Sequence, residues 1–120
     1  GAYLESPEIA FPEKADVDAN YVKLTDDYLG NISDAYLCLA THDEEMIRAA
    51  ENSVVKHNVP SDKYEFQMLY GVRSDRQEEL AQKYTMRVYV PFGEAWYPYF
   101  VRRLAERPAN LWFFMKNFFG

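Results

Sequence analysis

Short apolar runs of strand length alternate along the chain with longer segments whose apolar residues recur at helical spacing. The strand candidates cover residues 35–41, 64–70 and 86–90, and residues 1–4 read as the end of a fourth strand. The helix candidates cover residues 17–29, 42–57, 75–84, 94–106 and 108 onward. Because one strand and one helix together take about thirty residues, this alternation predicts parallel strands joined by right-handed crossovers.

Four βα units of this α/β kind fit a small doubly wound sheet or half of an eight-unit barrel. Polar residues stand inside the strand candidates at Glu65, Gln67, Arg87 and Tyr89. A doubly wound sheet buries both faces of its strands, whereas a barrel tolerates polar side chains near the carboxyl ends, where sites are built. The phosphate motif G-x-G-x-x-G of a dinucleotide fold does not occur. We therefore expect half of a (β/α)8 TIM-like barrel.

The same spacing predicts which residues face the core. Tyr21, Leu24 and Tyr28 recur three or four residues apart, so we expect them on the buried side of the first helix. Gly30 follows them and is expected to end that helix. Cys38 stands inside an apolar strand candidate, where burial is the usual state of a free cysteine.

Composition excludes several classes of protein. Hydrophobic residues make up 48% and aromatic residues 17% of the 120 residues, which excludes an intrinsically disordered chain. A single cysteine excludes an intrachain disulfide and a cysteine-based zinc site. No apolar run approaches the roughly 20 residues of a spanning helix, so we expect no transmembrane segment. The net charge of −6 argues against a nucleic-acid partner, because phosphate contacts need clustered cations.

Charge is unevenly distributed along the chain. Residues 1–60 carry 12 acidic and 4 basic side chains, a net charge of −8, whereas residues 61–120 carry 7 acidic and 9 basic ones, a net charge of +2. A cationic site late in the chain would suit a small anionic ligand better than a polyanion.

The adjacent pair Arg102 and Arg103 is the sharpest candidate for such a site. Neighbouring helical residues point about 100° apart, so two guanidinium groups can approach one carboxylate from different sides. Glu106 follows Arg102 by four residues and could hold it in place. The alternative is an ordinary solvated face of a helix.

Thr41 and His42 stand where a strand ends and a helix begins, a place that gathers anions and cofactor phosphates. His42 could also donate a proton or a hydrogen bond. The alternative is that Thr41 only caps the helix, in a capping box with Glu44 three residues later. His57, at a helix end, is expected on the surface or in contact with the C-terminal end of the helix dipole.

Tyr89 and Tyr99 flank the turn at residues 91–93, and Tyr99 lies four residues before Arg103 on the same helix face. Tyrosine rings could wall an apolar substrate while their hydroxyls bond a ligand. The alternative is ordinary core filling. The pattern of residues alone does not name a reaction.

Five segments together resemble the proline dehydrogenases, the FAD-dependent enzymes of proline catabolism, and most closely the single-function bacterial ones. They are GAY at residues 1–3, ATH at 40–42, YEFQMLYG at 64–71, RVYVP at 87–91 and RRLAERPAN at 102–110. The resemblance implies a distorted eight-unit βα barrel with FAD at the carboxyl ends of its strands. Residues 1–120 would be one domain, the C-terminal half of that barrel, holding its last four strands.

The resemblance also implies roles for individual residues. Arg102 and Arg103 would bind the carboxylate of L-proline, and Glu106 would brace Arg102. The remaining substrate positions would be Tyr89, Tyr99 and Leu69 around the ring and Tyr3 at the edge, whereas FAD would be contacted by Thr41, His42, Gly1 and Ala2. The implied reaction is oxidation of L-proline to 1-pyrroline-5-carboxylate, with hydride transfer to FAD and electrons passed to a quinone.

Further expectations concern the chain as a whole. We expect the isolated 120 residues to be inactive, and to self-associate or to pair with the other half of the barrel, since an open half barrel exposes strand edges. A cytoplasmic location is expected, with peripheral contact at the inner membrane face left open. The alternative function is a non-catalytic interaction module that uses the aromatic segment at residues 111–119.

Overall fold

A computed structural model describes residues 5–105 of the chain. These residues form two compact units: residues 11–89, and a second unit that includes residues 5–10 and 90–105. The expected first strand at residues 1–4 and the helix from residue 108, with its aromatic segment 111–119, lie outside the described residues.

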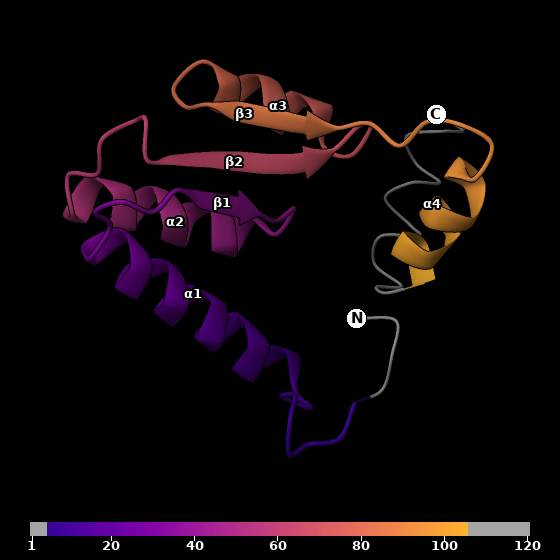
Figure 1. Cartoon of the computed structure of the whole chain (residues 1–120), viewed down its shortest axis with the longest axis horizontal. Helices are drawn as coiled ribbons and strands as arrows, with labels where there is room; N and C mark the ends of the chain where they lie inside the picture. The colour runs from indigo at the N-terminus through magenta and orange to yellow at the C-terminus, as the bar shows by residue number, and fades with distance from the viewer. Residues whose placement is uncertain (1–4, 106–120) are drawn as a thin grey trace. The chain divides into compact units, whose positions relative to one another are not determined.

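The unit at residues 11–89 contains a parallel three-stranded sheet in the order β1-β2-β3 (Figure 1). The strands are β1 (Leu37–Ala40), β2 (Tyr64–Leu69) and β3 (Met86–Tyr89). The helices of this unit are α1 (Lys14–Gly30), α2 (Glu44–Lys56) and α3 (Ser74–Ala81). Because α2 connects β1 to β2 and α3 connects β2 to β3, the predicted α/β pattern with parallel strands is confirmed.

The core of this unit lies between one face of the sheet and the three helices. Its residues on β2 alternate along the strand, and Leu39 of β1 is the register partner of Phe66. Phe66 is at the centre of β2. The centre of its ring lies 5.2 Å from the ring centre of Tyr84 and 6.3 Å from the ring centre of Tyr64. The cluster of buried residues consists of Leu29, Leu39, Ile47, Ala50, Val54, Tyr64, Phe66, Met68 and Leu80.

Two predictions about buried residues are wrong. Cys38 is exposed, because it alternates with buried Leu39 and therefore points to the sheet face opposite the helices. In α1, Leu24 and Tyr28 are about half exposed, at 47% and 56%, whereas Thr25 and Leu29 are buried. The inward face of α1 is thus rotated by one residue from the face that the apolar spacing predicts.

Polar contacts of Asp26 accompany this rotation of α1. Its carboxylate accepts hydrogen bonds from Ser53 Oγ at 2.7 Å and Lys56 Nζ at 2.8 Å, and lies 2.9 Å from His57 Nε2. These hydrogen bonds hold the pKa of Asp26 well below its ordinary range, and the one from Lys56 contributes most. Asp26 thus faces the end of α2, while its neighbour Thr25 and Leu29 one turn later face the core.

Gly30 ends α1 where the imidazole of His57 approaches the helix. A Cβ atom at residue 30 would lie 2.9 Å from His57 Cε1, closer than carbon atoms normally come. The ring is bonded to Asp26 and cannot move away without losing that contact. Glycine is therefore required here by close approach rather than by its backbone dihedral angles.

We expect Gly30→Ala to destabilise the protein, because the new methyl group would displace His57 from Asp26. In a His57→Ala background the same change should become neutral or stabilising by up to about 1 kcal/mol, since alanine favours helix over glycine. Urea unfolding of the four proteins measures this double-mutant cycle. An equal cost of Gly30→Ala in both backgrounds would contradict the account of the contact.

Candidate functional site

The carboxyl ends of the three parallel strands meet at one edge of the sheet. Leu69 ends β2 and Tyr89 ends β3, and the two residues are partners in the register of these strands. Tyr70 N–H then donates to the Tyr89 carbonyl oxygen at 2.9 Å. Thr41 and His42 directly follow β1. Four of the predicted site residues therefore lie at the same edge.

A hydrogen bond joins two of these residues across strands. The backbone N–H of Leu69 donates to Nε2 of His42 at 2.9 Å. A backbone amide can only donate, so Nε2 must accept, and the neutral imidazole carries its proton on Nδ1. The contact joins a residue predicted to bind a cofactor to a residue predicted to bind a substrate.

The predicted capping box at Thr41 is wrong. Helix α2 begins at Glu44, and its N-cap is Asp43, whose Oδ1 accepts from Glu45 N–H at 3.0 Å. Thr41 Oγ1 instead accepts from Asp43 N–H at 3.1 Å, which tightens the turn before the helix. Thr41 and His42 therefore belong to the turn before the helix, and in this turn His42 accepts from Leu69 N–H.

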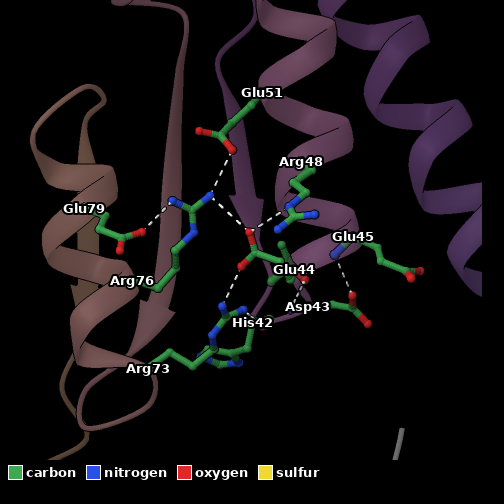
Figure 2. Close-up of polar contacts among 10 residues, drawn as sticks. His42, Asp43, Glu44, Glu45, Arg48, Glu51, Arg73, Arg76 and Glu79 are labelled. Atoms are coloured by element: carbon green, nitrogen blue, oxygen red, sulfur yellow. Dashed lines mark hydrogen bonds and ion pairs between the residues drawn. The ribbon is translucent and has the colours of Figure 1, made fainter.

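A network of arginine and glutamate side chains surrounds this turn (Figure 2). Arg73 donates from Nη1 to the carbonyl oxygen of His42 at 2.7 Å and from Nη2 to Glu44 Oε2 at 2.5 Å. Arg76 lies 3.3 Å from Glu44 Oε1 and also binds Glu51 and Glu79. The turn after β1 is thereby connected to the start of α3.

The sheet face opposite the helices carries a second charged cluster. Glu65 is only 1% exposed, and its carboxylate accepts two hydrogen bonds from Arg87, at 2.5 and 2.7 Å. Gln67 Nε2 donates at 2.6 Å and Tyr36 Oη at 3.0 Å. The hydrogen bonds from Arg87 and Gln67 lower the pKa of Glu65 to about 2. We call these four residues the polar-face cluster.

The second unit contains α4 (Trp96–Ala105), which carries three further predicted site residues. The guanidinium carbon of Arg103 lies 5.5 Å from the centre of the Tyr99 ring, a cation–π contact across one turn. Arg103 is half-buried, whereas Arg102 is exposed. The prediction that Tyr99 and Arg103 share one helix face is confirmed.

Other predicted site residues, Gly1, Ala2, Tyr3 and Glu106, lie outside the described residues. Within residues 5–105, no group of three or more His, Cys, Asp and Glu side chains could hold a metal ion. No helix in the same range is both long and apolar enough to cross a membrane.

Sequence reasoning missed Arg73 and the pairing of Glu65 with Arg87. Glu65 and Arg87 did give a signal. Charged residues in the middle of strand candidates indicate an ion pair between neighbouring strands, whose side chains lie close enough to pair. Arg73 gave none, because it stands in a turn and its partner Glu44 lies 29 residues away in the sequence.

Comparison with known proteins identifies the family. The sequence model described as proline dehydrogenase matches residues 1–116. The chain is 51% identical over 118 residues to proline dehydrogenase 2 of Bacillus subtilis, and 48% identical over 120 residues to the proline dehydrogenase of Deinococcus radiodurans. The chain belongs to the proline dehydrogenase family.

Both alignments cover 98% of the chain. They cover only 38% of the Bacillus subtilis relative and 37% of the Deinococcus radiodurans relative. The chain thus spans under two fifths of the length of the curated relatives it matches. By full-length protein we mean a polypeptide as long as these relatives that contains residues 1–120 in the segment to which they align.

We expect Arg87→Gln to destabilise the full-length protein, because buried Glu65 loses its cation. The folded pKa of Glu65, about 2, is below its ordinary value of 4.5. The ionised pair therefore adds stability above about pH 4.5, and this contribution is lost as the pH falls toward 2. Urea midpoints should differ most between wild type and variant at pH 6–7 and converge below about pH 3.

A Glu65→Gln, Arg87→Gln double variant is the matched control, because it removes both charges together. Its urea midpoint should change less with pH than that of wild type. A constant difference between wild type and Arg87→Gln from pH 7 to pH 3 would contradict the assigned ion pair.

Proposed function

We propose that the full-length protein catalyses the FAD-dependent oxidation of L-proline to 1-pyrroline-5-carboxylate and passes the electrons to a quinone. The observation that carries this proposal is the assembly of Thr41, His42, Leu69 and Tyr89 at the carboxyl edge of one parallel sheet. Sites of βα barrels are built at this edge. The relatives, which are named proline dehydrogenases, support the choice of substrate.

We further propose that residues 1–120 form the C-terminal half of a (β/α)8 barrel. Helices cover one face of the sheet, as on the outside of a barrel, and the polar-face cluster would then lie inside. Charged groups inside a barrel need partners, and Glu65 has three. The remaining strands would come from the rest of the full-length protein.

The donors at the carboxyl edge fit a flavin nucleotide. The neutral imidazole of His42 carries its proton on Nδ1 because Nε2 accepts from Leu69. The Thr41 oxygen accepts from Asp43 N–H, so this hydroxyl donates through its own proton. Phosphate, hydroxyl and carbonyl oxygens of FAD are acceptors for such groups. FAD, when bound, takes up the two electrons of the oxidation. Gly1 and Ala2 are proposed as further contacts.

The proline carboxylate is assigned to the arginine pair of α4. Arg102 and Arg103 would bind the proline carboxylate, since guanidinium groups bind carboxylates with two parallel hydrogen bonds. Stacking on Tyr99 orients Arg103, which lowers the entropy lost on binding. The other proposed positions are Leu69 and Tyr89 beside the ring, Tyr3 at the edge and Glu106 as a brace for Arg102. These residues orient the substrate and exclude water.

We expect Arg102→Lys and Arg103→Lys in the full-length protein each to weaken proline binding by about 1.5–3 kcal/mol, because a charge-assisted hydrogen bond is lost. The measurement is KM for proline, with proline Kd from quenching of flavin fluorescence. Arg48→Lys is the matched control, because the Arg48 side chain on α2 is exposed. It should leave both KM and Kd for proline unchanged. An unchanged proline Kd in both α4 variants would remove the carboxylate assignment.

A further inference from the structure

Arg73 occupies a backbone position that an arginine does not favour. It is the N-cap residue of α3, with φ 54° and ψ 49°, in the left-handed region where side chains with a Cβ are crowded. Its own side chain provides no cap to the helix. On backbone grounds alone glycine would serve better here, so the side chain must offer something that glycine lacks.

The side chain of Arg73 reaches back to the turn that follows β1 (Figure 2). Its two terminal nitrogens bind the carbonyl oxygen of His42 and the carboxylate of Glu44, at 2.7 and 2.5 Å. His42 is consequently held at two points, by the last residue of β2 and by the turn that follows it. Leu69 N–H fixes its ring and Arg73 fixes its backbone.

Glu44 is itself oriented by the surrounding cations. Its Oε1 lies 3.3 Å from Nη2 of the largely buried Arg76, which leaves Oε2 directed at Arg73. The contact of Oε1 with Arg48 is at the surface, where the Arg48 side chain is 72% exposed, and contributes little to this orientation. Burial opposes ionisation of this carboxyl, but the hydrogen bond from Arg73 and the charge of Arg76 outweigh burial and lower its pKa. Glu44 therefore stays charged and keeps Arg73 extended toward His42.

Arg73 differs from the other arginines of this network in one contact. Arg48 and Arg76 bind Glu44 but have no hydrogen bond to His42 among those found in residues 5–105. Arg73 alone in this group links the carboxylate network to the residue that faces the proposed cofactor. Its loss should therefore alter His42 without removing the contacts of Arg76 with Glu51 and Glu79.

We infer that Arg73 is a positioning residue for FAD binding: it fixes the backbone of His42 so that the Nδ1–H of the imidazole keeps one direction. This inference rests on the proposed role of His42 as a cofactor contact. Arg73 itself touches neither substrate nor cofactor in this account. It acts through His42.

The variant that tests this is Arg73→Gly in the full-length protein. Glycine accepts the left-handed backbone, so the turn can keep its shape while both side-chain hydrogen bonds are lost. Arg48→Gln is the matched control, because it removes a contact of Glu44 and leaves the hydrogen bond to His42 in place.

Two measurements are made on each protein: the Kd for FAD, from titration of the apoprotein followed by flavin fluorescence, and the ¹⁵N NMR signals of the His42 ring in protein labelled at histidine. We expect Arg73→Gly to weaken FAD binding about tenfold, the effect of one charge-assisted hydrogen bond, and to shift the His42 signals. Arg48→Gln should change neither. In a His42→Ala background, Arg73→Gly should have no further effect on the Kd for FAD.

Unchanged FAD binding in Arg73→Gly, with weaker binding in His42→Ala, would overturn the role of Arg73 and leave the proposed function standing. Equal losses from Arg73→Gly with and without His42 would also overturn it, because Arg73 would then act only through the fold. Unchanged FAD binding in both single variants would remove His42 from the cofactor site, and the role of Arg73 would fall with it.

Discussion

The hydrogen bond from Leu69 N–H to His42 Nε2 is the contact on which the candidate site depends. It joins the carboxyl ends of two neighbouring parallel strands at a distance of 2.9 Å. Parallel pairing brings the strand ends to one edge, but it does not orient the side chains that follow them. The hydrogen bond does so for His42, because it fixes both the direction of the ring and its protonated nitrogen. Arg73 adds the second point of attachment.

The two faces of the sheet obey different physical constraints. The helical face is held by packing of aromatic and aliphatic side chains around Phe66. The opposite face buries the carboxylate of Glu65, and burial of a charge is tolerated only when partners replace water. Arg87, Gln67 and Tyr36 provide those partners. The sheet therefore has one apolar face, covered by the helices, and one polar face whose buried charge is satisfied.

Local sequence patterns predicted the helices and strands within residues 5–105 because each pattern reports on one element at a time. Apolar spacing located the strands, and Gly30 ended α1 as expected. Spacing failed where contacts between elements decide. Asp26 of α1 is bonded to the end of α2, and α2 begins only at Glu44, after the turn in which His42 accepts from Leu69. Neither contact is visible from local periodicity.

The candidate site was predicted in a similarly uneven way. Strand ends and family motifs selected His42, Leu69 and Tyr89, and the parallel register places them along one edge. Arg73 could not be selected, because its importance arises from a turn that brings it to a residue 31 positions earlier. Residues that support a site from a distant segment of the sequence can be identified only from the tertiary structure.

The most direct test is a crystal structure of the full-length protein with FAD and a five-membered-ring carboxylate that cannot be oxidised. We predict His42 Nδ1 within about 3 Å of an oxygen or nitrogen atom of FAD, as for a normal hydrogen bond. We also predict both guanidinium groups of Arg102 and Arg103 on the carboxylate of the ligand. FAD bound away from the carboxyl edge of β1 and β2, or a carboxylate held without either arginine, would contradict the account.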